Sequence, residues 1–439
     1  MMAKREKHKN KTYLKPDQVE YVGPFAMARY GKFIVMRNVM NPEQHKDFMH
    51  HAAERYPTIC KDIDDRVNRI RSLVREFHPL SLLKYGYDAF AVKSIRKTAE
   101  VELDADVGIA LRMVDYIQSI IVSTQKSAIS ITEHADENKW KELYAEVEKL
   151  YSQLNLDFHI SHTALLKQDP ENYDEGYDEF YVKAQMLWAN VRGCRYSIHN
   201  VPLLRSLLSP HDDIFKELFN ISINEFLDGI NKIRDSLSYG LPDAYLDLME
   251  FQKKTMEIVT DRMSEVVTVD DLKEITHRVI AKQGWQEWQN AIMSRIFQFD
   301  LFDVQKVTGL PEKLLRGLSW EPGEHQDFFA PGEFVGWPLR ILPVQIRPFL
   351  YVEGRYYCFD LFSLMDNLYR VVQRMITRLR PDYKEAWNTR QKFVSERLPF
   401  ELLEKLLPNS RTYLTIYHQC PTGKAGELNW CETDGLMLF

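Results

Sequence analysis

Two acids near the end of the chain, Glu432 and Asp434, are of a residue type and at a spacing that could bind a metal ion. They are two positions apart in an apolar run, 429–439, that has the composition of a β-strand, so both side chains should face one side of it. Upstream, Glu396 lies in a predicted amphipathic helix, 383–407. Carboxylate oxygens bind Mg²⁺, and the bound ion can activate water for phosphodiester hydrolysis. These acids therefore indicate metal-dependent phosphodiester chemistry.

The order helix, strand 412–417, loop and second strand, with Asp434 in Glu-Thr-Asp-Gly-Leu-Met, resembles the opening of a PD-(D/E)xK (restriction-endonuclease-like) nuclease core. The resemblance covers 392–439. It implies that Asp434 and Glu396 are catalytic and bind Mg²⁺, with Glu401 as a second choice for the helix acid. The Glu-x-Lys motif that the core next requires is absent from this chain. The resemblance therefore implies a metal-dependent endonuclease of defence or restriction type in its complete form. We expect this truncated chain to hold Mg²⁺ weakly and to lack robust nuclease activity.

A strand after residue 439 would normally pair with the last strand of such a core. Without it, Leu436, Leu438 and Phe439 should leave backbone groups unpaired and apolar surface exposed. We expect this edge to fray or to self-associate with a second chain. The preceding helix carries an apolar stripe that should pack on the sheet, formed by Phe393, Leu398, Leu402, Leu403, Leu406 and Leu407.

Three arginines, Arg370, Arg374 and Arg378, recur at four-residue steps in a predicted helix, 360–380. Residues four apart share a helix face. The plain interpretation is a solvated face, and the functional one is a strip that binds nucleic-acid phosphates. Just upstream, 303–319 predicts two short helices around a Gly-Leu-Pro turn. That arrangement is helix-turn-helix-like, but it is also typical of helical hairpins that do not bind DNA.

Two other groups of residues allow different chemistry. Arg192 and His199 have a spacing that resembles the Arg-x₄₋₆-His motif of the HEPN ribonucleases. The resemblance implies that this pair would polarise the phosphate and assist proton transfer. His418, Cys420 and Cys431 could supply three zinc ligands, although no fourth is evident. The competing class is not enzymatic, with the helical region acting as an interaction scaffold.

Composition narrows the class of protein. The 439 residues are 45% hydrophobic and 12% aromatic, which fits a folded globular chain rather than a disordered one. No apolar run is long enough to cross a bilayer and no signal peptide is recognisable, so no membrane partner is expected. Five scattered cysteines without a Cys-x-x-Cys motif favour reduced thiols and a cytoplasmic localisation. The net charge of −6 argues against a uniformly basic surface but allows a local basic groove.

Hydrophobic periodicity predicts a mainly α fold. Asn41 followed by Pro42 predicts a capped helix start, and Ser209 and Thr268 predict two others. The most apolar helix, 109–121, should be central. We predict four parts: a basic tail and N-terminal extension, 1–40; a large helical domain, 41–300; a small α+β module with a β-hairpin, 301–380; and a partial α/β nuclease-type segment, 381–439.

Overall fold

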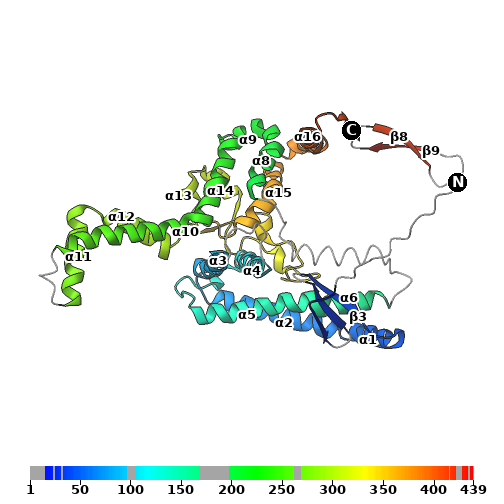
Figure 1. Cartoon of the computed structure of the whole chain (residues 1–439), viewed down its shortest axis with the longest axis horizontal. Coiled ribbons are helices and arrows are strands. Elements are labelled where there is room, and N and C mark those ends of the chain that lie inside the picture. Colours follow the sequence, from blue (N-terminus) through cyan, green and yellow to red (C-terminus); the bar gives the residue numbers. More distant parts are fainter. Residues whose placement is uncertain are drawn as a thin grey trace. The chain divides into compact units, whose positions relative to one another are not determined.

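The computed structural model describes residues 15–22, 25–30, 33–95, 105–168, 197–261, 268–414, 416–421, 428–433 and 436–438. In these residues the chain is mainly α-helical with four small sheets, which confirms the predicted fold class (Figure 1). Contacts divide the chain into two compact units, Met1–Ile63 with Ser152–Met186 and Asp64–Tyr151 with Leu187–Phe439. The domain boundaries at residues 40, 300 and 380 remain predictions. None of the described helices combines the length and the apolar character needed to cross a membrane.

The first unit begins with a three-stranded antiparallel meander, β1 (Gln18–Val22), β2 (Phe25–Tyr30) and β3 (Phe33–Asn38). These strands lie within 1–40, the predicted basic tail and N-terminal extension, and were not expected there. The signal was present, because all three segments are rich in Val, Ile, Tyr, Phe and Met, and several of these residue types favour strands.

Helices complete the first unit. Asn41 accepts a hydrogen bond from the Gln44 N–H and Pro42 opens the helix, which confirms the predicted start. Small side chains at Ala52, Ala53 and Ala164 form a buried cluster that lets two helices approach closely. The helical segments are α1 (Pro42–Glu54), the start of α2 (Tyr56–Arg75), a π-helical turn (Leu154–Phe158) and α6 (His159–Leu166).

The core of the second unit is built around α4 (Ala105–Val122). Its residues from Met113 to Val122 are all buried, which confirms the predicted central helix for its described side chains. Helix α3 (Pro79–Ile95) approaches it at Gly86, where an added Cβ would lie 2.6 Å from Val114 Cγ2. Helix α5 (Glu137–Gln153) is joined to α2 by an ion pair of 2.6 Å between Arg66 and Glu146.

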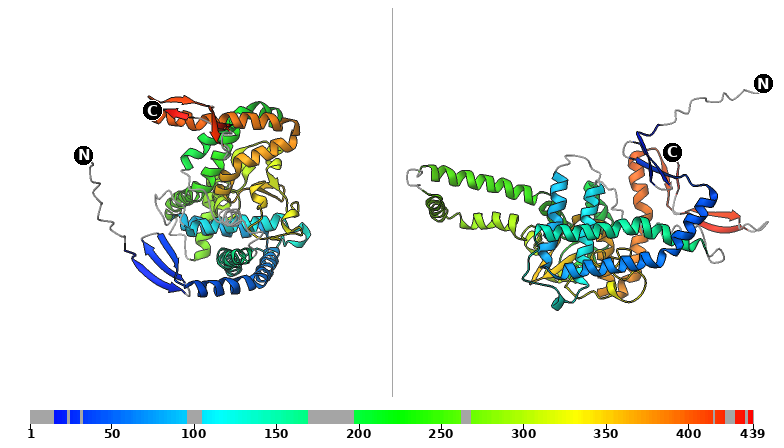
Figure 2. Two further views of the ribbon diagram at one scale, coloured as in Figure 1. Left: turned by 90° about the vertical axis from the view of Figure 1, so that its right-hand side faces the viewer. Right: turned by 90° about the horizontal axis from the view of Figure 1, so that it is seen from below.

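A long helix, α10 (Ile223–Thr260), links two groups of helices in the second unit. Its first part packs on α8 (Ser197–Leu208) and α9 (Asp212–Phe219), and its last part on α11 (Val269–Gln283) and α12 (Gln286–Phe297) (Figures 1 and 2). Thr268 caps α11 as predicted. The predicted cap at Ser209 is wrong, because its hydroxyl donates to the Arg205 carbonyl and α9 begins at Asp212 without a side-chain cap.

The region 301–380 has the predicted pair of short helices and the hairpin. Gly309 ends the first helix at φ +70°, and the hairpin turns at Glu353 and Gly354, both with positive φ, as a two-residue turn requires. The next helix is capped by Asp360, whose carboxylate accepts from the Ser363 N–H. The elements are α13 (Val304–Thr308), α14 (Glu312–Gly317), β4 (Ser319–Trp320), β5 (Phe349–Val352), β6 (Arg355–Tyr357) and α15 (Leu361–Leu379), with β4 parallel and β6 antiparallel to β5.

The C-terminal segment differs in detail from the prediction. Each of the two predicted strands is divided, and the pieces form two separate antiparallel pairs, β8 with β9 and β7 with β10. The apolar stripe of the preceding helix does not pack on a sheet as expected, since Phe393, Leu402, Leu403 and Leu406 are exposed. Leu436 and Leu438 are exposed, although β10 pairs with β7. The elements are α16 (Lys384–Leu406), β7 (Arg411–Tyr413), β8 (Ile416–Pro421), β9 (Leu428–Thr433) and β10 (Leu436–Leu438).

Candidate nucleic-acid interface

The three arginines predicted from their spacing lie on the exposed face of α15. The opposite face of this helix is apolar and buried, so the helix can rotate little and the arginines are held at the surface. Arg374 Nη1 donates to the Gln345 carbonyl at 3.2 Å, and Arg378 Nη2 donates to the Gly317 carbonyl at 3.3 Å. Arg370 donates to the Gln373 side chain at 2.8 Å. Each guanidinium is therefore oriented by a hydrogen bond that uses one of its five N–H donors.

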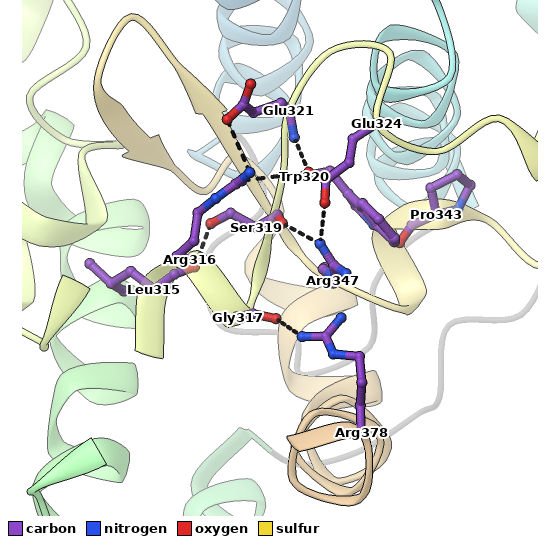
Figure 3. A network of polar contacts seen from close by, with 10 residues as sticks. All are labelled: Leu315, Arg316, Gly317, Ser319, Trp320, Glu321, Glu324, Pro343, Arg347 and Arg378. Carbon is purple, nitrogen blue, oxygen red and sulfur yellow. Dashed lines mark hydrogen bonds and ion pairs between the residues drawn. The ribbon is translucent and has the colours of Figure 1, made fainter. Parts of the chain in front are cut away.

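Two further arginines from other segments, Arg316 and Arg347, lie near Arg378 (Figure 3). Arg347 Nη1 lies 2.7 Å from Glu324 Oε1 and also donates to the Ser319 carbonyl at 3.2 Å. Arg316 pairs with Glu324 at 3.5 Å and with Glu321 at 3.0 Å. The two acids thus fix Arg316 and Arg347 on either side of β4. Together the five arginines come from α14, the loop before β5, and α15.

Trp320 positions Arg347 by stacking against its guanidinium. Its ring is buried, its Nε1 donates to the Pro343 carbonyl at 2.9 Å, and the Arg347 guanidinium lies 3.7 Å from the ring centroid. A cation stacked on an aromatic ring is stabilised by the ring quadrupole. Gln345 Oε1 and Arg347 Nε are buried and make no hydrogen bond within the described residues. The guanidinium of Arg347 is therefore positioned by stacking and by its terminal nitrogens.

The electrostatics of the group favour a negative ligand. Burial alone would raise the pKa of Glu324, but the Glu321 N–H and the charges of Arg347 and Arg316 outweigh it and lower that pKa. Burial, and then the nearby charge of Arg347, lower the pKa of Arg378. Arginine remains protonated under such shifts. Glu321 and Glu324 form ion pairs with Arg316 and Arg347, whereas Arg370, Arg374 and Arg378 make their hydrogen bonds to uncharged groups.

The acids predicted to bind Mg²⁺ are only partly described. Glu396 lies on α16 with 21% of its side chain exposed and pairs with Lys392 at 3.4 Å. Glu401, the second choice, pairs with Arg397 at 2.6 Å. Asp434 lies outside the described residues, so its proximity to Glu396 stays a prediction. Within the described part of the chain, no cluster of three or more His, Cys, Asp or Glu side chains is arranged to hold a metal ion.

The alternative sites are also incomplete in the described structure. His199 is exposed on α8, whereas Arg192 lies outside the described residues. His418 and Cys431 are directly opposite each other in the β8–β9 pair, and Cys420 is opposite Asn429. The register therefore places two of the three suggested zinc ligands side by side on neighbouring strands.

A buried cluster anchors α16, the helix that carries Glu396. His211 is fully buried and stacks on Trp387, with ring centroids 3.7 Å apart, and its Nδ1 lies 3.1 Å from the Tyr383 hydroxyl. Arg390 donates to that hydroxyl at 2.6 Å and forms a two-point ion pair with Asp213. Burial, reinforced by the charge of Arg390, lowers the pKa of His211 to about 4. At neutral pH the imidazole is therefore uncharged.

No protein-family model, curated protein or solved structure matches this chain. The α15 arginines are predictable from the sequence because they recur at helical spacing, whereas Arg316 and Arg347 are not. Each of those is a single arginine in an apolar or loop segment, and they come together through the parallel pairing of β4 with β5 and through Glu324, which pairs with both.

Proposed function

We propose that this chain is a nucleic-acid-binding protein and that the α15 arginines of the five-arginine group of α14, α15 and the loop before β5 contact the phosphate backbone. The observation that carries the proposal is that Arg316, Arg347 and Arg378, from three segments, lie close together, with Arg370 and Arg374 on the same exposed face of α15 as Arg378. Nucleic-acid affinity comes largely from arginines and lysines that neutralise phosphates and release counterions. Arginine is suited to this task because its planar fork can bind phosphate oxygens at two points.

The three α15 arginines would make the direct contacts. Arg370, Arg374 and Arg378 are exposed, and each keeps N–H donors beyond the one that orients it. Arg316 and Arg347 would act differently, since Glu321 and Glu324 already pair with them. We infer that they hold β4 and its loop in place and contribute positive potential.

The test compares binding of fluorescein-labelled single-stranded and duplex oligonucleotides by anisotropy, over a series of salt concentrations. The variant replaces Arg370, Arg374 and Arg378 with Gln. It should weaken binding at least tenfold and lower the salt slope by about one per lost phosphate contact. The matched control is Arg278→Gln on α11, an exposed arginine that pairs only with Glu274 among the described residues. Equal losses in the variant and in the control would reject the proposal.

The nuclease role remains a separate part of the proposal. In a nuclease of the kind that the C-terminal segment resembles, Glu396 and Asp434 would bind an Mg²⁺ ion, and the nucleic acid held by the arginines would be cleaved. Glu396 already pairs with Lys392 at 3.4 Å, so we expect the chain to hold Mg²⁺ weakly, to bind nucleic acid without it, and to leave plasmid and single-stranded substrates intact. Mg²⁺-dependent cleavage by the pure chain, abolished by Asp434→Ala, would contradict this expectation.

A second candidate function is that of an interaction scaffold. The observation that favours it is the exposure of apolar side chains along helices of the second unit, including Leu402 and Leu406 on α16 and Leu246 and Met249 on α10. Exposed apolar rows are typical of surfaces that contact another protein. If the α15 triple variant binds nucleic acid like the control, this function gains support.

A further inference from the structure

The last part of α10 has an outward apolar stripe that the described residues of its unit leave exposed. The opposite face of this segment packs on α11 and α12 through Ala244, Phe251 and Val259. On the outward face, exposed fractions are 61% for Tyr239, 63% for Leu246, 66% for Met249 and 46% for Met256. Figures 1 and 2 show α12 lying along one side of this part of α10.

The spacing of these residues is that of a helix-pairing seam. Leu246, Met249 and Met256 follow one another at intervals of three and seven, and Tyr239 lies seven positions before Leu246. Alternating a and d positions of a heptad have this arrangement. From Tyr239 to Met256 the seam extends over about 25 Å of helix, with Pro242 at the d position between Tyr239 and Leu246. It is therefore long enough to receive a helix of several turns.

The charges beside the seam select the partner. Asp243, Glu250 and Glu257 recur every seven residues and line one edge, and Asp243 and Glu257 form no ion pair within the described residues. Lys254 pairs with Glu250 at 2.7 Å. The other edge carries Gln252 and no charge. A helix with lysines or arginines flanking its apolar stripe would complement the acidic edge.

Lys253 interrupts the seam between Met249 and Met256. A single polar residue at such a position fixes the register of a helix pair. Parallel pairing of two copies in register would place Lys253 against Lys253, and antiparallel pairing would bring the two acidic edges together. Like charges at those distances are unfavourable, so a second copy does not fit. The acidic edge likewise disfavours nucleic acid and anionic membranes.

We propose that this seam, formed by Tyr239, Leu246, Met249 and Met256 with its acidic edge, binds a basic amphipathic helix of another protein. The partner helix should carry an acidic residue opposite Lys253. The interface involves one helix on each side and is smaller than a standard protein interface, so affinity should be in the micromolar range. The proposal does not depend on nucleic-acid binding by the α15 arginines.

The test uses two synthetic 21-residue helical peptides with Leu at a and d positions and one Glu at the central a position. One peptide has Lys at the e and g positions, and the other has Glu there. Titration calorimetry should show the Lys peptide binding at least tenfold more tightly than the Glu peptide. Equal binding of the two peptides, or no binding of either at millimolar concentration, would overturn the proposal.

Variants locate the site. Leu246→Glu with Met249→Glu should abolish binding of the Lys peptide, whereas Val269→Glu, an exposed apolar position on α11, should leave it within twofold. Glu250→Lys with Glu257→Lys changes only exposed charges and should reverse the peptide preference. Failure of this reversal would reject the assignment even if the apolar variant proved unstable. Dimerisation in light scattering that Leu246→Glu removes would show that a second copy occupies the seam, and would also overturn the proposal.

Discussion

Acidification should destabilise the second unit through His211. Its pKa in the folded chain is lowered to about 4, against about 6.5 when unfolded. The unfolded state therefore binds more protons below pH 6.5, and stability falls as the pH falls from about 6.5 towards 4. The loss attributable to this one imidazole is about 2 kcal/mol at pH 5 and about 3 kcal/mol at pH 4. Above pH 7 its contribution is constant.

The neighbouring groups set the useful pH window. A hydrogen bond from Arg390 is the main cause that lowers the pKa of Asp213, so protonation of that carboxylate also costs stability, but only at lower pH. Arg390 stays charged throughout. Between pH 7 and 5 the difference between the wild type and a variant without the imidazole should therefore come from His211 alone.

Urea unfolding followed by circular dichroism at pH 7 and pH 5 measures the effect. His211→Gln removes the titrating group and also the stack on Trp387, so it should be less stable than the wild type at pH 7. Its further loss on going to pH 5 should be smaller than that of the wild type by about 2 kcal/mol. Equal losses in the two proteins would refute the reasoning, because they would mean that His211 is solvated or becomes charged without penalty.

Three further outcomes are expected. Gly336→Ala should cost about 3 kcal/mol, because Gly336 has φ +70° and a Cβ would overlap the Phe329 ring, whereas Gly284→Ala, at φ +68° in open space, should cost about 1 kcal/mol; urea midpoints measure both. Asp360→Ala should cost about 1 kcal/mol by removing the cap of α15, with Asp360→Asn close to wild type. Cys358 is fully buried and burial raises its thiol pKa, so mass spectrometry should find it unmodified after iodoacetamide treatment of the native chain at pH 8 and alkylated in urea.

Local signals in the sequence predicted much of the fold. Asn41 and Thr268 cap helices as predicted because a cap depends on residues only three positions away. The turn at Glu353 and Gly354 likewise needs only positive φ at two adjacent positions. The predicted helix cap at Ser209 was wrong because the Ser209 hydroxyl donates instead to the Arg205 carbonyl, one helical turn earlier.

Long-range arrangements could not be predicted in the same way. The parallel pairing of β4 with β5, which brings Arg316 close to Arg347, joins segments about thirty residues apart in the chain and leaves no periodic trace. The seam on α10 has a clear period, but period alone does not show which apolar face is covered. The structure shows which face of α10 is covered, because α12 packs on the face that carries Phe251 and leaves Leu246 exposed.

Segregated charge reconciles the two proposals with a chain whose net charge is −6. Arginines concentrate on α15 and around β4, whereas Asp243, Glu250 and Glu257 line one edge of α10. A protein with both signs in separate places can attract phosphate at one site and a basic helix at another, because fields at physiological salt decay within about 8 Å. The two proposals therefore predict that one substitution at each site weakens binding at that site and leaves binding at the other site unchanged. Arg374→Glu should weaken oligonucleotide binding and leave the Lys peptide unaffected, and Glu257→Lys should do the reverse. Joint loss in either variant would show that the two surfaces are not independent.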